Sequence, residues 1–580
     1  MSKANNKFLN GAITLILCSL LAKIIGAIYK IPLLKTLQSD GLGKFQMVIS
    51  VYALFLVISS SGLVVTLSKV ISKEVAYKNT HNQKKYLTAG LLISIIISSF
   101  LALIMIAISP ILSKYQSFYN LQYSFIAISP AIIFSSLIAV LRGYFLGKRK
   151  MIYSGSVQII EAIFKLILSL YLSIKFSANG GVGAVFGAVL GITFSELISL
   201  LFLFCLFLIS KKRSAKLQNR FNTVLKINFN NFEIANKKTK KKPAFNKKSI
   251  NFFKKIKISA SKQDNFIDTR NRNFHCKTRY KSLIEAIKET ISISFFVTLQ
   301  ACVLPLIGAI DGLVVVPLLL KSGLSQSIAY SLFGIEDGVV SAILSMPTII
   351  ASSVSSAIIP NIKTQKNYAD LIKNAFKIVW LISIFCATIF IFFSSDITNF
   401  LYGSGLNSKT INELAISSDM LRINGFNIIY ISLLSLSSGV LQGLDRSVVP
   451  VKNLFIATIL RFIVLLVCLT SSVINIYGLA IADMSFYACA MLLNIKKIKE
   501  ITNVAYNVKH MFILPSISLF AMTLLMYFVK NLLSGILTFR IVTLCVMISG
   551  GVLYLALLYF TKTLNMGDII SLRKKTSANK

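Results

Sequence analysis

The sequence predicts an all-α polytopic membrane protein of about 14 transmembrane helices, arranged as two six-helix lobes in parallel pseudo-repeat with two extra C-terminal helices. The first observation behind this fold class is composition. Of the 580 residues 55% are hydrophobic and 14% are charged, and the mean hydropathy is +0.74. Soluble enzymes are less apolar and carry more charge. The second observation is a series of long apolar runs, and the third is an internal repeat.

The apolar runs are each about 18 residues or longer, enough to cross about 30 Å of hydrocarbon as a helix. Their approximate centres are Cys18, Phe55, Ser99, Phe134, Leu166, Leu197, Leu299, Ser345, Phe385, Ser432, Leu465, Met484, Leu519 and Val552. The first run lacks the short hydrophobic region and small-residue cleavage site of a signal peptide. We therefore expect it to be an uncleaved span.

The net charge of +42 would suggest a nucleic-acid partner if the protein were soluble. Here the Lys and Arg residues instead concentrate in alternate loops, for example GKRK (Gly147–Lys150) and KKIKE (Lys496–Glu500). Such an alternation is the positive-inside asymmetry of membrane proteins. It predicts a multi-pass protein with both termini in the cytoplasm, and no nucleic-acid partner.

One long polar insert, Lys211–Lys281, divides the chain, and its only acidic residues are Glu233, Asp264 and Asp268. Its composition predicts a partly disordered cytoplasmic loop, and an electrostatic grip on anionic lipid headgroups is the alternative. The expected division is residues 1–210 for the N-lobe with helices 1–6 and 211–281 for the basic loop. Residues 282–500 then form the C-lobe with helices 7–12, and 501–580 form helices 13–14 and a cytoplasmic tail.

The internal repeat relates the beginnings of the two halves. Ile25–Gly43 and Ile307–Ser325 align without gaps through IGAI, a shared leucine and a shared Gly-Leu pair. Later, VLRG (Val140–Gly143) is matched by VLQG (Val440–Gly443). Chance similarity of apolar spans is the alternative to duplication. Because six spans per half is an even number, duplicated halves would share one orientation about an axis along the membrane normal.

Several segments carry a family resemblance. They are KIIGAIYKIPLLKTLQSDGLGKFQMVISVYALFLVISSSGLVVTLSKVISK (Lys23–Lys73), SGSVQIIEAIFKLIL (Ser154–Leu168), PLIGAIDGLVVVPLLLKSGLS (Pro305–Ser325), MPTIIASSVSSAIIPNI (Met346–Ile362) and GVLQGLDRSVVPVKN (Gly439–Asn453). Together they resemble the stage V sporulation protein B branch of the polysaccharide-flippase families, in the multidrug/oligosaccharidyl-lipid/polysaccharide exporter superfamily. The resemblance implies two six-helix lobes around a central cavity, and movement of lipid-linked saccharides, including peptidoglycan precursors, across the cytoplasmic membrane.

The eighth span departs from one branch of that superfamily. The lipid II flippases carry basic residues shortly before a proline that matches Pro347, whereas this chain has the uncharged stretch VVSAILSM (Val339–Met346). The cavity chemistry of the lipid II flippases is therefore not carried over whole.

Two lysines interrupt the first span. Lys23 lies about fourteen residues past Leu9, near the middle of the bilayer at about 1.5 Å per residue. An ionised lysine at that depth is costly unless it faces water or a partner. Lys30 follows two turns later, so both side chains project from one helical face. We expect that face to line the substrate path, and snorkelling of Lys30 to the external interface is the alternative.

The fifth span carries Gln158, Glu161 and Lys165, and the Glu-to-Lys spacing of four residues allows an intrahelical pair. Such a group either closes a network between helices or lines the substrate path and offers Lys165 to an anion. Arg461 occupies the position in span eleven that Lys165 occupies in span five.

Asp311 in span seven stands where Tyr29 stands in span one, so the two lobes are expected to present opposite charge across a cavity. In the empty cavity Asp311 is expected to pair with a lysine. The candidate residues of the substrate cavity are Lys23, Tyr29, Lys30, Glu161, Lys165, Asp311 and Arg461.

Sequence motifs for catalysis are missing. RGYFLGKRK lacks the spacing and the Ser or Thr of a phosphate-binding loop, and no HExxH motif or Cys/His cluster occurs. The eight cysteines are scattered without disulfide or metal spacing. We expect no enzyme activity, no catalytic residues, no metal and no cofactor.

The excess of cationic groups suits an anionic substrate such as a lipid diphosphate with its sugar. The leading hypothesis is a flippase or exporter of lipid-linked saccharide or peptidoglycan precursors, working by alternating access in cell-envelope or spore-cortex biogenesis. The expected location is the bacterial cytoplasmic membrane, with a monomer contacting membrane lipids and its lipid-linked substrate. The alternatives are a cation-coupled multidrug exporter of the same superfamily and a membrane scaffold for envelope assembly.

Overall fold

The computed structural model describes residues 2–77, 79–115, 119–238, 280–362, 368–403, 408–471, 473–502 and 509–563. Within these ranges the regular secondary structure is helical, without strands. Thirteen helices are long and apolar enough to cross a membrane, and the first contains two successive arms. The predicted all-α membrane fold of about 14 spans is therefore confirmed.

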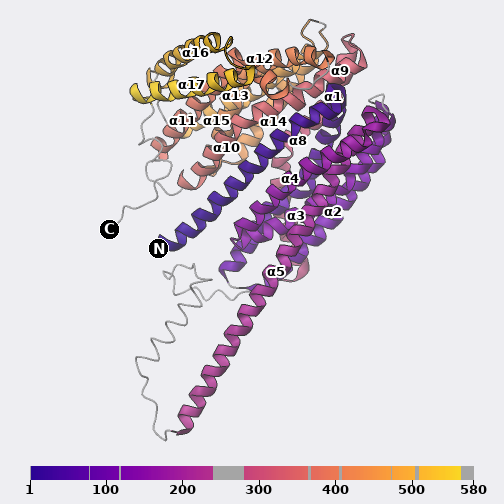
Figure 1. Ribbon diagram of the computed structural model, residues 1–580. Helices are drawn as coiled ribbons and strands as arrows, with labels where there is room; N and C mark the ends of the chain where they lie inside the picture. Colours follow the sequence, from indigo (N-terminus) through magenta and orange to yellow (C-terminus); the bar gives the residue numbers. More distant parts are fainter. Residues whose placement is uncertain are drawn as a thin grey trace.

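The first half of the chain is built from five long helices (Figure 1). They are α1 (Ser2–Ala76), α2 (Thr80–Tyr115), α3 (Gln122–Gly147), α4 (Met151–Phe176) and α5 (Gly180–Lys238), with short turns η1 (Tyr119–Leu121) and η2 (Ser177–Asn179). The two arms of α1 meet at Gln38, whose backbone is non-helical at φ 57° and ψ 178°. Each arm is one of the predicted spans.

The second half contains more and shorter helices. They are α7 (Leu283–Ala301), α8 (Val303–Lys321), α9 (Gln326–Phe333), η3 (Gly334–Val340), α10 (Ser341–Ile362), α11 (Tyr368–Phe392), α12 (Ser394–Tyr402), α13 (Ser408–Gly443), α14 (Val448–Leu469), α15 (Tyr477–Thr502), η4 (Lys509–Ile513), α16 (Leu514–Leu533) and α17 (Phe539–Phe560). Both η3 and η4 are π-helices.

The two halves repeat one packing order. In the first half α1 and α2 each pack on α3, and α5 packs on both α3 and α4. In the second half α10 and α11 each pack on α13, and α15 packs on both α13 and α14. Since the helices correspond in chain order, this recurrence supports the predicted duplication, and the lobe boundaries themselves stay a prediction.

Helices α16 and α17 pack against each other, and they attach to the outside of the second half through α11 and α12. Trp380 of α11 donates to the Met511 carbonyl at 2.8 Å, and Tyr554 of α17 donates to the Leu381 carbonyl at 3.0 Å. Lys530 of α16 pairs with Asp396 of α12 at 2.7 Å. These three polar contacts hold the additional helices at the edge of the bundle.

Two features differ from the predicted division of the chain. Helix α5 continues to Lys238, so the segment that was expected to be a loop from residue 211 begins as helix and extends away from the bundle (Figure 1). The rest of the expected loop, 239–279, lies outside the described residues. The second difference concerns α7, which opens the expected C-lobe but packs on α1 and α2 of the first half.

The position of α7 has a clear cause in its sequence. Ser282 and Glu285 form a capping box, each side chain bonding the other's backbone N–H, so the helix begins firmly at Leu283. The apolar face of α7, including Ala286, joins a buried cluster with Leu67 of α1. At Gly62 of α1 a Cβ would lie 2.5 Å from the carbonyl oxygen of Ser294, so only a glycine permits this approach.

A polar contact holds the start of α7 against α2. The ammonium of Lys281 donates to Glu289 of α7 and to the hydroxyl of Tyr86 of α2. Burial lowers the pKa of Lys281, but the bonds to Glu289 and Tyr86 outweigh burial and raise it above its ordinary value. Lys281 is thus charged at neutral pH and forms an ion pair with Glu289, and this pair holds the hydroxyl of Tyr86 from α2.

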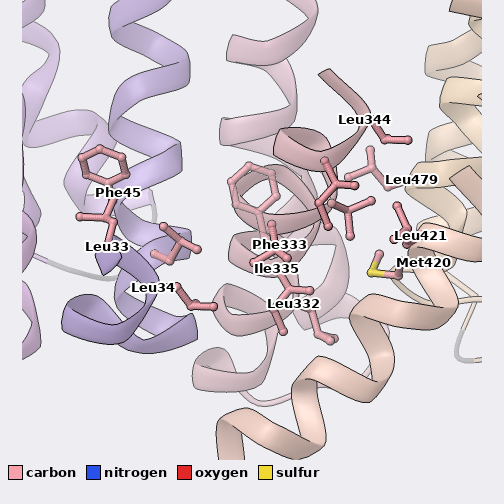
Figure 2. Packing of buried hydrophobic residues seen from close by; sticks show 14 of the residues in the cluster. Leu33, Leu34, Phe45, Leu332, Phe333, Ile335, Leu344, Met420, Leu421 and Leu479 are labelled. Carbon is pink, nitrogen blue, oxygen red and sulfur yellow. The ribbon is translucent and has the colours of Figure 1, made fainter. Parts of the chain in front are cut away.

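One apolar cluster joins both halves (Figure 2). It contains Leu33, Leu34 and Phe45 of α1 together with Phe333 of α9, Ile335 of η3 and residues of α13 and α15. In Figure 1 the first arm of α1 runs between the helices of the first half and those of the second. The main hydrophobic core therefore includes the contact between the halves.

The closest approach between the halves is made by glycines. A Cβ at Gly43 of α1 would lie 2.0 Å from the carbonyl oxygen of Tyr330 in α9. A Cβ at Gly334 of η3 would lie 2.5 Å from the carbonyl oxygen of Ser39. Neither position tolerates a side chain, because both opposing atoms belong to the backbone.

We predict that Gly43→Ala separates α1 from α9 and lowers the melting temperature of the purified protein. The Cβ would overlap the Tyr330 carbonyl, and overpacking of this kind costs about 1–3 kcal/mol. Gly26→Ala is the matched control, because it lies in the same helix with nothing within 4 Å of a new Cβ. Thermal unfolding in detergent measures both, and equal melting temperatures would contradict the predicted contact.

Candidate functional site

Charged residues of the second half meet at one guanidinium. Arg461 of α14 donates from Nη1 and Nη2 to the two carboxylate oxygens of Asp311 in α8, at 2.7 and 2.8 Å. Its Nε donates to Asp483 of α15 at 2.7 Å. The Arg461 side chain is 4% exposed, against 15% for Asp311 and 26% for Asp483. A planar guanidinium suits this arrangement, since its fork matches a carboxylate with two parallel bonds.

The cluster of Arg461, Asp311 and Asp483 corrects one expectation. Asp311 was expected to pair with a lysine, and its partner is Arg461 of the same half. The physical reason is that the guanidinium fork of Arg461 matches both oxygens of the carboxylate, which a lysine cannot do. The place of Arg461 in the substrate cavity stays a prediction, and in this structure its donors are occupied by two carboxylates.

Lys30 lies where α1 meets the π-helix η3. Its ammonium donates to the backbone carbonyl of Asp337 at 3.1 Å, and Gln46 of the second arm donates to the same oxygen at 2.7 Å. A π-turn widens the helix and leaves carbonyls free for such partners. Lys30 is half-buried, and no carboxylate lies within ion-pair distance of it in the described residues.

Span five of the prediction is α4, and its polar residues face α1 and the interior of the first half. Gln158 accepts a hydrogen bond from Ser19 of α1 at 2.6 Å. Glu161 and Lys165 are half-buried and do not form the predicted intrahelical pair. At longer range the buried Glu196 of α5 attracts Lys165 and repels Glu161, which carries the same charge. Gln158 thus bonds α1 directly, whereas the roles of Glu161 and Lys165, in a network between helices or in the substrate path, stay predictions.

The remaining two candidates have different surroundings. Lys23 is exposed on α1 and makes no hydrogen bond or ion pair to any described residue. Tyr29 is only 5% exposed, and its hydroxyl lies beside Ser169 of α4 within the packed first half. The structure thus places Tyr29 in helix packing and Lys23 at a surface.

Lys30 and Lys165 are brought together by the fold, although they come from different helices. Their charges act on each other across the contact between α1 and α4. The sequence related Lys165 to Arg461, and the structure shows the difference between them. Arg461 is neutralised by its two aspartates, whereas Lys165 has no carboxylate at ion-pair distance among the described residues.

Sequence reasoning left several polar residues without a role. Asp483 completes the Arg461 cluster, and Glu336 of η3 bonds Asn424 of α13, which bonds Asn427. One signal was present in the sequence: NGFN places two asparagines three residues apart within an apolar span, on one helical face. In the described residues no three His, Cys, Asp or Glu side chains gather as a metal site.

Comparison with known proteins agrees with this architecture. The fold matches a solved structure of the lipid II flippase MurJ in an inward closed conformation, with a TM-score of 0.66 and 15% identity. The match covers 95% of this chain and 99% of that one. The class that the fold defines is therefore a polytopic membrane protein with the MurJ fold.

The sequence matches name a family. Residues 8–232 match the family described as polysaccharide biosynthesis protein. The chain is 26% identical to stage V sporulation protein B of Bacillus subtilis over 38% of its length and 42% of that protein. It is 25% identical to the lipid II flippase MurJ of the same organism over 32% of its length and 37% of that protein. The chain thus spans about two fifths of these relatives, and the family resemblance predicted from the sequence is confirmed.

We predict that Arg461→Ala destabilises the protein by up to about 3–5 kcal/mol, because it leaves two partly buried carboxylates without a counter-charge. Lys165→Ala should change stability far less, since Lys165 has no ion pair to lose among the described residues. Replacing Arg461 and Asp311 together by leucine should recover part of the loss, and the coupling follows from a double-mutant cycle. Melting temperatures in detergent measure all variants, and additive losses would contradict the pairing.

Proposed function

We propose that this protein is a transporter that moves a lipid-linked saccharide with an anionic headgroup across the bacterial cytoplasmic membrane. The observation that carries the proposal is that three lysines of the first half have no ion-pair partner among the described residues. Lys23, Lys30 and Lys165 lie in or at membrane spans, and none has a carboxylate at ion-pair distance among the described residues. The names of the matched relatives, a lipid II flippase among them, support the same class of cargo.

The distribution of charge suggests which half binds the cargo. In the second half Arg461 is neutralised internally, so that half attracts little anion. In the first half the ammonium groups of Lys30 and Lys165 repel each other, and a diphosphate placed between them would relieve this repulsion. Charge-assisted bonds to phosphate are also stronger than the single bond that Lys30 makes to a carbonyl.

The contact at Lys30 offers a link between binding and movement. Lys30 and Gln46 share the Asp337 carbonyl at the place where α1 packs against η3. A phosphate that takes Lys30 removes one of these two bonds, which loosens the contact between the halves. Alternating access then follows from separation of α1 and η3 on one side of the membrane, as in two-lobed transporters generally.

The location and topology belong to the same proposal. Positive-inside charge places both termini in the cytoplasm. A monomer suffices for the mechanism, since both halves of the transporter lie in one chain. The process served is assembly of the cell envelope or of the spore cortex, as the name of the sporulation relative suggests. No catalytic step is required for this activity.

We predict that Lys30→Ala or Lys165→Ala weakens binding of an undecaprenyl-pyrophosphate saccharide by about 10- to 100-fold. The estimate follows from about 1.5–3 kcal/mol for a hydrogen bond to a charged group. Lys84→Ala is the control, because Lys84 is exposed at the start of α2. Native mass spectrometry with lipid II, undecaprenyl-pyrophosphate glycans and plain anionic phospholipid measures the binding. Equal binding of every anionic lipid by all variants would refute the proposed cargo site.

A further inference from the structure

The π-helix η3 carries a second polar residue that faces away from α1. Glu336 is 5% exposed and contacts α13, whereas the neighbouring Asp337 offers its carbonyl to α1. The seven residues of η3 therefore connect the contact between the halves with the interior of the second half.

A directional chain of hydrogen bonds leads to Glu336. The amide nitrogen of Asn427 donates to Asn424 Oδ1 at 2.7 Å and to the Ala480 carbonyl at 3.2 Å. The amide nitrogen of Asn424 donates to Glu336 Oε1 at 2.9 Å and to the Met420 carbonyl at 3.1 Å. Because the two carbonyls only accept, they set both amide orientations, and all four N–H groups are used.

Two oxygens at the ends of this chain have no donor. Glu336 Oε2 and Asn427 Oδ1 are enclosed and make no hydrogen bond, although Asn427 is 1% exposed. A buried acceptor without a donor costs about 1–3 kcal/mol, and more when it is charged. Two acceptor oxygens of one connected hydrogen-bond network therefore lack an N–H or O–H donor.

The surrounding charges do not compensate Glu336. Asp337 of its own element and Asp483 of α15 both act on it electrostatically, and both are acidic. On α1, Lys30 donates to the Asp337 carbonyl, and on α14 Arg461 is taken by its two aspartates.

The described side chains of the other helices packed on η3 add no free cation. On α13, Arg422 lies beside Asp419 at an exposed position. Helix α9 contributes the phenol of Tyr330, and α10 has no ionisable side chain. No described cation forms an ion pair with Glu336, and an ionised carboxylate in such a site carries a large desolvation penalty.

We propose that Glu336 is a proton-binding site, protonated in the closed arrangement seen here and deprotonated when α1 separates from η3. Oε2 is enclosed, so a larger cation does not fit beside it. A proton adds almost no volume, and it turns this oxygen into a donor. On opening, the proton passes from Oε2 to the water that enters, and the carboxylate is then solvated. That this proton release drives transport rests on the proposed function. The protonation of Glu336 does not depend on it.

Infrared spectroscopy of the full chain in lipid nanodiscs tests the protonation directly. At neutral pH the wild type should show the C=O stretch of a protonated carboxylic acid, and Glu336→Gln should lose it. Glu500→Gln, at an exposed residue of α15, should keep the band. A wild-type spectrum without a band that depends on Glu336 would overturn the proposal. A carboxylate band of Glu336 that shifts when sodium replaces choline would also overturn it, in favour of a sodium site.

The stability of the variant separates a proton site from a structural carboxylate. An amide resembles a protonated carboxyl in shape, so Glu336→Gln should melt within a few degrees of the wild type, and severe destabilisation would count against the proposal. If that variant does not accumulate, Asn424→Ala replaces it. That change removes the donor to Oε1, so the acid band must shift, and an unchanged band would refute the assignment.

Transport distinguishes failure of this inference from failure of the proposed function. In proteoliposomes, flipping of a lipid-linked saccharide by the wild type should respond to an imposed pH gradient, and Glu336→Gln should lose that response. If the wild type moves no such lipid but shows the Glu336 band, the proton site stands and the cargo is wrong. If it moves the lipid without the band, the cargo stands and the proton site is wrong.

Discussion

The need to compensate every charge inside hydrocarbon governs how the spans are arranged. In the second half this need is met by Arg461, which binds aspartates from two other helices and ties α8, α14 and α15 together. In the first half it is met without an ion pair at close distance, by the carbonyl and the longer-range charge of Asp337 for Lys30 and by longer-range attraction to Glu196 for Lys165. One half is therefore fixed by its own charges, whereas the other keeps cationic groups available.

The π-helix η3 contacts both the lysine of the first half and the buried polar network of the second half. On one side its Asp337 carbonyl holds Lys30 and Gln46, and close glycine contacts bring the backbones of α1 and η3 together. On the other side Glu336 ends a chain of buried amides. The two contacts are made by neighbouring residues of a segment of only seven residues. A change in the contact with α1 would therefore also change the surroundings of Glu336, which is how the proposed anion site and the proposed proton site would be coupled.

Hydropathy and loop charge were enough to predict the spans, because hydrocarbon accepts few structures other than apolar helices. Repeated motifs predicted a duplication, and the common packing order of the two halves agrees with it. Tertiary partners were beyond this reasoning: periodicity places Arg461 on a helical face but does not show that Asp311 faces it. The helical extension of α5 past residue 210 and the docking of α7 on the first half were missed for related reasons. A basic composition, such as that of the segment after residue 210, does not exclude a helix. A sequence repeat does not show which neighbouring helices a span packs against.

Span seven shows why the division into two lobes is not simple. Its first part, α7, is held to α1 and α2 by Lys281, by a buried apolar face and by the close approach at Gly62. Its second part, α8, is held to α14 by the bond between Asp311 and Arg461. The backbone bonds of Cys302 join the two parts as a nearly continuous helix. Any rotation of one half against the other must therefore bend this junction or break the contact at one of its ends. The Lys281–Glu289 pair, which holds Tyr86 of α2, is more exposed than the Arg461–Asp311 pair.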